Sequence, residues 1–308
     1  TMPTPEIICI GELLLDLISL DYAEDFRAAD KYQRLPGGSP ANLAMNLARL
    51  GRAAALIATV GQDDAGKLLI DAVAKAGVQT EHIARHSDPT TLILVTKSKT
   101  VSDFEPYRMA DYQISADQLP EAYLASAKIV HTTAFALSKE PARTNILSAM
   151  HKAASRGVRL SVDFNYADKI WGNDRSAGLE TLTEIAQAGG MIKVSEVDFE
   201  RLFEEMVIDY HSAAHKIKDL GASLVCLTLG AEGCFVVHSE GEFYLPAQEV
   251  EVKDTTGAGD AFWSGFLAAH LAGMDWEACA RSGRGMAALK LGTIGPLQQP
   301  VDLRAIGQ

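Results

Sequence analysis

The sequence has no apolar run long enough to cross a membrane and no excess of basic residues. Its longest apolar run, residues 53–60, has the length of a strand, whereas a membrane-spanning helix needs about 18–20 apolar residues. Lys and Arg number 28 against 40 Asp and Glu, a formal charge of −12. Because no basic patch interrupts this negative charge, we expect neither nucleic acid nor an anionic membrane as a partner. The first residues also lack a basic region followed by a long apolar stretch, which predicts no secretory signal.

Cysteine is scarce as well, and its four positions suit neither a disulfide framework nor a metal site. There is no C-x-x-C pair, and no cysteine accompanies a cluster of histidines. Cys9 and Cys226 lie inside strand-like runs, where cysteine behaves as a small hydrophobic residue. We therefore expect reduced thiols in the core and a cytoplasmic protein. Apolar residues at 47% and charged residues at 22% are ordinary for a folded chain and exclude intrinsic disorder.

Strand-like and helix-like runs alternate along most of the chain, which predicts an α/β fold. The predicted strands cover residues 6–11, 54–60, 128–133, 158–164, 191–194 and 223–229. The predicted helices cover residues 41–50, 65–76 and 141–156, and most of the chain after residue 260. Such alternation is typical of a mostly parallel sheet with helices on both faces, here in one domain spanning residues 1–308.

Two segments break this alternation, because they contain strand-like residues without an amphipathic helix between them. They span about residues 13–35 and 90–114. We expect them to form one small antiparallel sheet that acts as a lid on the main domain, and two long surface loops are the alternative.

A glycine-rich turn, D-T-T-G-A-G-D at residues 254–260, leads into a run with helical apolar spacing. A dinucleotide-binding fingerprint would need a third glycine where Phe262 stands and an apolar strand before the turn, so that interpretation is weak. The free N–H groups and the positive end of the helix dipole predict an anion site instead. Asp260 is then a candidate base, or simply a favourable charge at a helix N-terminus.

A second motif, P-G-G-S-P-A-N at residues 36–42, places two glycines directly before a predicted helix. Glycine lets the backbone approach a ligand closely, and the Asn42 amide can both donate to and accept from a sugar hydroxyl. A turn followed by an asparagine on a helix surface is the alternative.

A third motif, G-Q-D-D-A-G-K at residues 61–67, has the spacing of a phosphate-binding P-loop. The next residue is Leu68, so the hydroxyl that would hold Mg²⁺ is missing. Two adjacent carboxylates would also point negative charge at the phosphates. We interpret this motif as a turn between a strand and a helix.

Together, the motifs at residues 37–42 and 254–260 resemble the two signatures of the ribokinase-like carbohydrate kinases of the phosphofructokinase-B type. The run L-A-R-L-G ending at residue 51 and the turn at residues 61–66 extend the likeness, which covers essentially the whole chain. The resemblance implies a ribokinase-like three-layer α/β/α sandwich with a mostly parallel sheet and a small antiparallel β lid. It also implies transfer of the γ-phosphate of ATP, with Mg²⁺ and, in many relatives, K⁺ as cofactors.

The resemblance implies a role for each residue that matches a family motif. The catalytic residues would be Asp260 as base, with the backbone amides of Gly257, Ala258 and Gly259 as anion hole. The substrate-binding residues would be Asp16, Gly37, Gly38, Asn42, Tyr107, Arg108 and Asn165. The nucleotide-binding residues would be Ser195, Thr228, Gly230 and Gly233. The metal ligands would be Glu196 and Asp198 for Mg²⁺, and Asp254 and Thr256 for the monovalent cation.

Four positions, in three segments, depart from the family pattern. The run S-E-V-D at residues 195–198 replaces Asn-x-x-Glu, but it keeps oxygen ligands suited to Mg²⁺. Ala167 replaces the arginine of an Asp-x-Asn-x-Arg motif, so a guanidinium fork for a carboxylate or phosphate is missing. Arg284 stands where relatives often place an asparagine near the adenine.

The motifs also bear on the substrate. The S-P-A-N form at residues 39–42 and the Y-R pair at 107–108 are most similar to fructokinases and keto-sugar-acid kinases. The alanine at 167 favours neutral fructose, whereas Arg108 would suit a carboxylate unless it is a solvated charge of the lid. We expect a fructokinase that makes fructose 6-phosphate.

Alternatives remain open within and outside the family. A different member of the family would phosphorylate 2-keto-3-deoxygluconate, ribose or another sugar instead of fructose. An alternative of another class is a catalytically silent sugar-binding or regulatory protein with the same fold. The exposed edges of a small lid sheet favour a homodimer.

Overall fold

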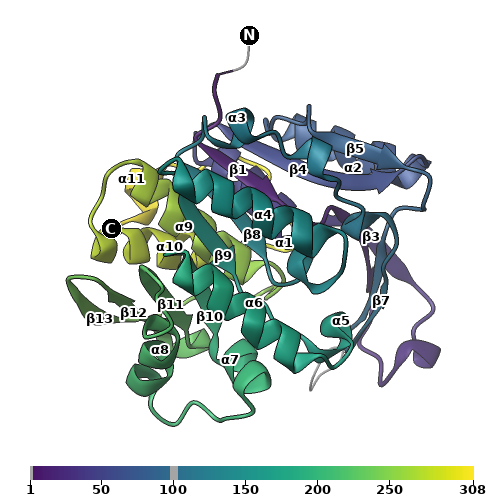
Figure 1. Cartoon of the computed structure of the whole chain (residues 1–308). Helices are drawn as coiled ribbons and strands as arrows, with labels where there is room; N and C mark the ends of the chain where they lie inside the picture. The colour runs from purple at the N-terminus through teal and green to yellow at the C-terminus, as the bar shows by residue number, and fades with distance from the viewer. Residues whose placement is uncertain (1–2, 98–102) are drawn as a thin grey trace.

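The computed structural model describes residues 3–97 and 103–308, and its largest element is a nine-stranded sheet (Figure 1). The strands in their order across it are β13 (Gly241–Pro246), β12 (Gly233–His238), β11 (Leu224–Thr228), β10 (Met191–Ser195), β9 (Arg159–Asp163), β8 (Ile129–Thr133), β1 (Ile7–Ile10), β4 (Ala54–Gly61) and β5 (Ile83–His86). The strands from β11 to β5 pair in parallel, and β12 and β13 add an antiparallel hairpin. The predicted α/β fold with a mostly parallel sheet is confirmed.

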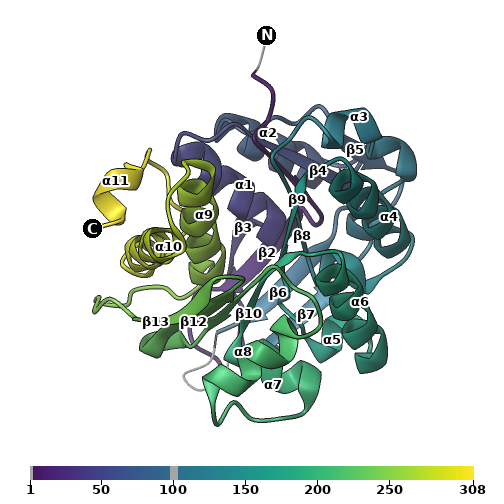
Figure 2. The ribbon, with the colours of Figure 1, turned by 60° about the vertical axis from the view of Figure 1, so that its left-hand side comes forward.

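Helices cover both faces of this sheet, as Figure 2 shows. On one face lie α3 (Glu121–Leu124), α4 (Ala142–Ser155), α5 (Asp168–Trp171), α6 (Arg175–Gln187), α7 (Glu196–Phe203) and α8 (Tyr210–Lys218). On the other lie α1 (Ser39–Arg49), α2 (Asp64–Lys75), α9 (Ala258–Leu271), α10 (Trp276–Leu291) and α11 (Leu303–Ile306). Side chains alternate along each strand, so Ile8 and Ile10 enter the first core while Ile7 and Cys9 enter the second.

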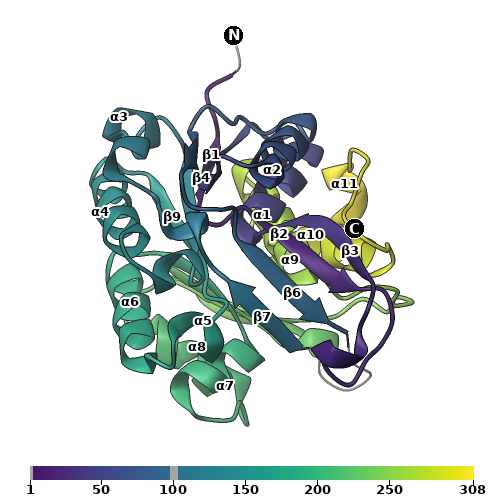
Figure 3. The same ribbon diagram turned by 90° about the vertical axis from the view of Figure 1, so that its right-hand side faces the viewer.

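A second, four-stranded sheet stands beside the main body, and Figure 3 views it from its own side. Its strands in order are β3 (Tyr32–Gly37), β2 (Leu14–Ser19), β6 (Leu92–Thr96) and β7 (Asp103–Tyr107). The outer pairs are antiparallel as expected, but β2 and β6 pair in parallel. The reason is that β2 follows β1 and β6 follows β5, so both strands leave the same edge of the large sheet in the same direction.

The predicted strands and the helices near residues 41–50, 65–76 and 141–156 all occur, with ends within two residues of the expected ones. Sequence reasoning did not find β5 or the hairpin β12–β13. Strand β5 reads I-A-R-H and is only partly buried, so its residues show no clear apolar pattern, and only its parallel pairing with β4 identifies it as a strand. All four cysteines are free and buried, as expected. Within residues 3–97 and 103–308, no helix is both long and apolar enough to cross a membrane.

Helices α9 and α10 pack so closely that a glycine is required between them. A Cβ added at Gly265 of α9 would lie 2.4 Å from the carbonyl oxygen of Ser282 and 2.9 Å from Cβ of Met286, both on α10. At Gly265, the two helices are therefore in direct contact. Buried aromatic residues of α9, such as Trp263, pack into the second core.

We expect Gly265→Ala to destabilise the protein. Alanine should gain about 1 kcal/mol in helix propensity, but the added methyl group must push α10 away, which typically costs about 1–3 kcal/mol in a packed core. Chemical denaturation followed by circular dichroism measures the difference. A free energy of unfolding equal to or above that of the wild type would contradict this account of the α9–α10 contact.

Candidate active site

The polar residues of the candidate site gather where the parallel strands end. Thr133, Asp163, Ser195 and Thr228 are the last residues of β8, β9, β10 and β11, and Glu12 follows β1. Ser195 and Thr228 are direct partners in the pairing of β10 with β11. Because the carboxyl ends of parallel strands meet at one edge, residues far apart in sequence are brought into a single line.

Asp260 lies in the first turn of α9, and two residues of α1 hold its carboxylate. Ser39 Oγ donates to Asp260 Oδ1 at 2.6 Å, and Asn42 Nδ2 donates to Asp260 Oδ2 at 3.0 Å. Burial and the nearby charge of Asp163 raise the pKa of Asp260 to about 6, although the two hydrogen bonds lower it. Asp260 is therefore mostly ionised at neutral pH but close enough to its pKa to accept a proton.

Asp16 lies on β2, with its carboxylate against the end of β3. A Cβ added at Gly37 would lie 2.1 Å from Asp16 Oδ2, so only glycine leaves room for the carboxylate there. Burial and the negative charge of Asp260 raise the pKa of Asp16 to about 7. The structure thus brings the predicted substrate carboxylate and the predicted base within electrostatic reach of each other.

Gly38 and Glu12 fix the start of α1. Gly38 has a φ of +103°, and a Cβ there would lie 2.2 Å from the carbonyl oxygen of Glu12. The Glu12 carboxylate accepts from Ser39 N at 3.2 Å and from Thr133 Oγ1 at 2.8 Å, and burial raises its pKa to about 8. Sequence reasoning did not single out Glu12, although its place directly after a buried strand is the signal that could have found it.

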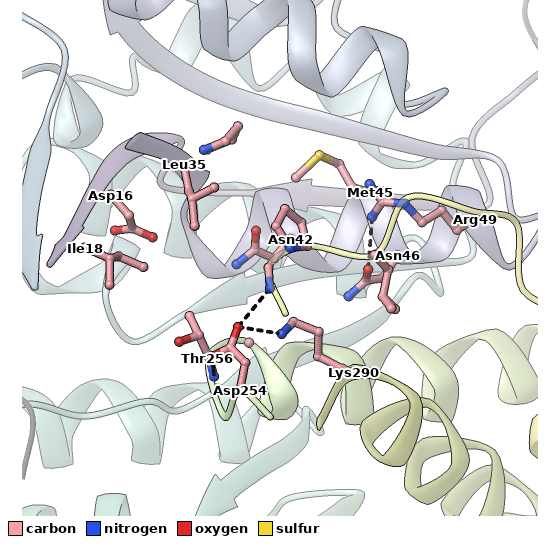
Figure 4. Close-up of a pocket in the computed structure, with 15 residues that line it drawn as sticks. Asp16, Ile18, Leu35, Asn42, Met45, Asn46, Arg49, Asp254, Thr256 and Lys290 are labelled. Carbon is pink, nitrogen blue, oxygen red and sulfur yellow. Dashed lines mark hydrogen bonds and ion pairs between the residues drawn. The ribbon is translucent and has the colours of Figure 1, made fainter. Parts of the chain in front are cut away.

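A pocket of about 540 Å³, open to solvent, runs from Asp16 past Asn42 to the glycine-rich turn (Figure 4). The small sheet contributes Asp16, Ile18 and Leu35 to its wall. On the opposite side are Asp254, Thr256, Gly257 and Lys290. One cavity therefore joins two of the predicted substrate residues, Asp16 and Asn42, to the turn that precedes Asp260, whereas the other predicted substrate residues do not line it.

Lys193 is a second residue that sequence reasoning missed. It lies in β10 among apolar residues, is buried, and its Nζ contacts Asp163 Oδ2 at 2.8 Å. Burial would lower the pKa of Lys193, but the charge and hydrogen bond of Asp163, together with the charges of Asp198 and Asp260, outweigh it and raise that pKa. A Cβ at Gly259 would lie 3.1 Å from Lys193 Nζ, so the ammonium stands directly against the glycine-rich turn.

The glycine-rich turn has the backbone needed at the start of α9. Gly257 has a φ of +75°, and the chain enters the helix at Ala258. The Ala258 N–H donates to the carbonyl oxygen of Thr255 at 3.3 Å, so one of the three predicted anion-hole amides already has a weak partner. The positive end of the α9 dipole lies at this turn.

Glu196 and Asp198, the predicted Mg²⁺ ligands, lie in the first turn of α7. Asp198 Oδ2 accepts from Ser195 Oγ at 2.6 Å, while Ser195 Oγ accepts from Asp198 N at 3.1 Å, which caps the helix. Burial raises the pKa of Asp198 to about 6, and burial with neighbouring glutamates raises that of Glu196. The buried Asp163 Oδ1 also has no hydrogen-bond partner among the described residues. Carboxylate oxygens are the ligand type that Mg²⁺ prefers, but Asp163, Glu196 and Asp198 do not gather their oxygens within 4.8 Å of one another, so they could hold the ion only together with further ligands such as phosphate oxygens.

Asp254 and Thr256, the predicted monovalent-cation ligands, do not form a comparable set. Asp254 Oδ1 accepts from Thr256 N at 2.9 Å, and Asp254 Oδ2 accepts from Lys290 Nζ at 3.2 Å. A side-chain ammonium therefore already stands beside the carboxylate that was expected to bind K⁺. The Asp254 oxygens, which already accept from Thr256 N and Lys290 Nζ, therefore do not fit an additional cation.

The predicted nucleotide residues lie around the turn between β11 and β12. Gly230 and Gly233 have φ values of +56° and +116°, and a Cβ at Gly233 would lie 2.1 Å from the carbonyl oxygen of Leu245. Arg284 on α10 donates to the carbonyl oxygen of Pro246 at 3.2 Å, at the end of β13. The structure thus brings Arg284 to the hairpin that follows this turn.

Arg108 is not the solvated charge considered as an alternative, since its side chain is only 3% exposed. Its Nε and Nη2 donate to Asp111 Oδ2 at 3.0 and 2.6 Å, and it also contacts Ser138 and the ring of Phe135. The guanidinium fork is thus bound within the protein. Tyr107 is 52% exposed on β7.

The remaining substrate prediction, Asn165, lies just after β9. Its Oδ1 accepts from the backbone N of Phe135 at 3.2 Å. Ala167, which replaces the expected arginine, is the residue before α5 and presents no polar side chain.

Helices on both faces of a mostly parallel sheet, with a small second sheet beside it, make the ribokinase-like fold of sugar kinases. Residues 4–301 match the pfkB family of carbohydrate kinases. The chain belongs to this family, as its two signature motifs predicted.

Several relatives share nearly its whole length. An ATP-dependent 6-phosphofructokinase of Thermoanaerobacterium thermosaccharolyticum is 34% identical over 98% of this chain and 92% of its own. The structure of Halothermothrix orenii fructokinase is 30% identical, with a TM-score of 0.79 over 94% of this chain and 98% of that one. A sugar kinase of Pyrococcus horikoshii in complex with ATP is 26% identical, with a TM-score of 0.82 over 96% and 95%.

Two glycines at opposite ends of α1 test the geometry of the site. Gly38 and Gly51 both have positive φ, but a Cβ at Gly51 would meet nothing within 4 Å. We expect Gly51→Ala to lose about 1–2 kcal/mol of stability from strain alone and to keep its activity. Gly38→Ala should lower kcat/KM by about tenfold or more, because it displaces Ser39 from Asp260. Steady-state kinetics measures kcat/KM of both variants, and melting curves measure their stability. If Gly38→Ala were as active as Gly51→Ala, Gly38 would not be needed to place Ser39 against Asp260.

Proposed function

We propose that this kinase transfers the γ-phosphate of ATP to a hydroxyl of fructose and makes fructose 6-phosphate. The observation that carries the proposal is the carboxylate of Asp260, held by Ser39 and Asn42 at the start of α9, with Asp16 on the pocket wall within its electrostatic reach. The likeness to Halothermothrix orenii fructokinase supports fructose as the acceptor, and the likeness to the ATP-bound Pyrococcus horikoshii enzyme supports ATP as the donor.

Asp260 acts as the general base. The sugar oxygen forms a bond to the γ-phosphorus while the bond from that phosphorus to the ADP oxygen breaks, and the hydroxyl proton passes to Asp260 Oδ. A pKa of about 6 leaves the base ionised at neutral pH yet basic enough to take the proton late in a loose transition state. Asp16, Gly38 and Asn42 orient the sugar, Asp16 by accepting hydrogen bonds from its hydroxyls.

The negative charge on the transferred phosphoryl group is stabilised by backbone amides, by a helix dipole and by a lysine. The backbone of Gly257, Ala258 and Gly259 and the dipole of α9 face the phosphoryl oxygens, and Lys193 stands directly behind Gly259. Ser195, Thr228, Gly230 and Gly233 position the nucleotide along the edge formed by β10 and β11. Mg²⁺, held by Glu196 and Asp198, would neutralise phosphate charge.

The site favours a neutral sugar over a sugar acid. Two guanidinium groups could have met a carboxylate: the family arginine at position 167, which is alanine here, and Arg108. The fork of Arg108 is bound to Asp111, so it cannot also clamp a substrate. With Asp16 lining the pocket and Asp260 within electrostatic reach of it, a further negative charge on the acceptor would be repelled rather than paired.

Fructose 6-phosphate is the second candidate acceptor, because the relative that matches 98% of this chain is named ATP-dependent 6-phosphofructokinase. Of the two basic residues that line the pocket, Lys290 is paired with Asp254, and Arg49 is bonded to Asn46. An additional phosphate would need one of them to change partners. We therefore rank fructose first.

An acceptor panel separates these possibilities. With saturating ATP and Mg²⁺, release of ADP is measured with fructose, fructose 6-phosphate, 2-keto-3-deoxygluconate, ribose and aminoimidazole riboside. We expect kcat/KM for fructose to exceed that of each other acceptor by about tenfold, roughly 1.4 kcal/mol of transition-state binding. A higher value for fructose 6-phosphate would establish the second candidate. No ADP release with any of them would favour a silent sugar-binding protein.

Replacing Asp260 tests its role as base. Asp260→Asn keeps the shape of the residue but cannot accept the proton, so kcat should fall by about 10²–10⁴-fold, or about 3–5.5 kcal/mol. The dissociation constant of the sugar should change much less, because the lost interaction belongs mainly to the transition state. Steady-state kinetics combined with calorimetric sugar binding measures both quantities.

Asp64→Asn is the matched control, because Asp64 is an exposed carboxylate in the first turn of α2. It should cost only about 0.3–1 kcal/mol of stability and leave the rate unchanged. In the wild type, the rate should rise with pH through about 6 as Asp260 loses its proton. A folded Asp260→Asn enzyme that keeps more than about a tenth of its kcat would exclude Asp260 as the base.

A further inference from the structure

Lys290 carries a positive charge into the wall of the pocket. It is in the last turn of α10 and only 6% of the residue is exposed. Its Nζ contacts Asp254 Oδ2 at 3.2 Å and the carbonyl oxygen of Thr293 at 3.4 Å. A buried ammonium is stable only where oxygen atoms replace its lost water, and here a carboxylate and a carbonyl oxygen do so.

These contacts join three segments around the glycine-rich turn. Asp254, which begins the turn, accepts from Thr256 N at 2.9 Å, from Gly295 N at 3.1 Å and from Lys290. The Cε atom of Lys290 lies 3.8 Å from where a Cβ on Gly257 would stand, so its stem runs beneath the first glycine of the turn. Lys290 thus ties the end of α10 and the loop after it to the segment that leads into Asp260 (Figure 4).

The resemblance to the family implied a K⁺ ion at Asp254 and Thr256, and the structure disagrees with that expectation. A lysine ammonium carries the same single charge as K⁺ and attracts the same carboxylate and carbonyl oxygens. Because it is covalently attached to α10, it is present at an effective concentration that a free ion cannot match. A second monovalent cation at Asp254 would be repelled by it at close range.

We propose that Lys290 replaces the monovalent cation and holds the 254–257 segment in place, so that this kinase works without K⁺. Lys290 is a positioning residue: it touches Asp254 and lies under Gly257, and it acts on the reaction only through the shape of the turn. The effect on catalysis rests on the proposed kinase function, whereas the effect on stability does not.

The first experiment compares KCl, NaCl and tetramethylammonium chloride at equal ionic strength. Wild-type kcat and melting temperature should be the same in all three salts, the rates within about twofold. A wild-type rate that is at least about fivefold higher in KCl, or a melting temperature raised by K⁺ alone, would overturn the proposal.

The second experiment removes the charge but keeps most of the stem, in Lys290→Met. In tetramethylammonium chloride its kcat should fall by about tenfold or more, and KCl should restore much of that loss by filling the vacated position. KCl should also raise its melting temperature, which a merely structural loss of packing would not produce. Lys253→Met, an exposed lysine next to the same segment, is the matched control and should respond to no salt.

The outcomes are separable. If Lys290→Met is as active as the wild type in tetramethylammonium, or if its defect is the same in every salt, Lys290 does not stand in for a cation. If Lys290→Met does not fold, the wild-type salt series still decides the question, and Lys290→Gln repeats the rescue with a side chain that packs similarly. If no sugar is phosphorylated in any salt, the proposed function fails, while the melting temperatures still test the cation replacement.

Discussion

The contact between the first turns of α1 and α9 is the constraint on which the site depends. Ser39 and Asn42 donate to Asp260 across separations of 221 and 218 residues in the chain. Each helix brings half of the candidate site: α1 supplies the hydrogen-bond donors, and α9 supplies the candidate base and follows the glycine-rich turn. Glycines at positions 37, 38 and 265 are needed around this site, because a Cβ there would lie within 2.4 Å of Asp16 Oδ2, of the Glu12 carbonyl oxygen and of the Ser282 carbonyl oxygen, respectively.

Clustered negative charge is the second feature that shapes this site. Burial and mutual repulsion raise the pKa of Asp16 to about 7 and those of Asp198 and Asp260 to about 6. Only charges of opposite sign make such a cluster tolerable, and two buried lysines provide them, Lys193 against Asp163 and Lys290 against Asp254. Asp16, Asp198 and Asp260 have no such ion-pair partner among the described residues. Their negative charge is relieved by their raised pKa values and, for Asp198 and Asp260, by the nearby Lys193.

Much of this protein could be predicted from its sequence because the signals are local. Alternating apolar periods define strands and helices, glycine pairs define turns, and the order of two motifs was enough to indicate the family. The weakest predictions concerned the short edge strand β5 and the direction of pairing in the small sheet. Partial burial hides the apolar pattern of β5, and pairing direction depends on where β2 and β6 leave the large sheet rather than on their own residues.

The sequence by itself determined the α/β class, the pfkB family and the identity of Asp260 as the candidate base, because each rests on residues that are neighbours in the chain. Only the tertiary structure decided which charges meet. From the sequence, Arg108 could have been a free guanidinium, but in the structure it is bound to Asp111. Lys193 and Lys290, which no sequence motif singles out, lie against the glycine-rich turn. The physical reason is that electrostatic partners are set by distance and burial, and both arise only when strands and helices far apart in sequence pack together.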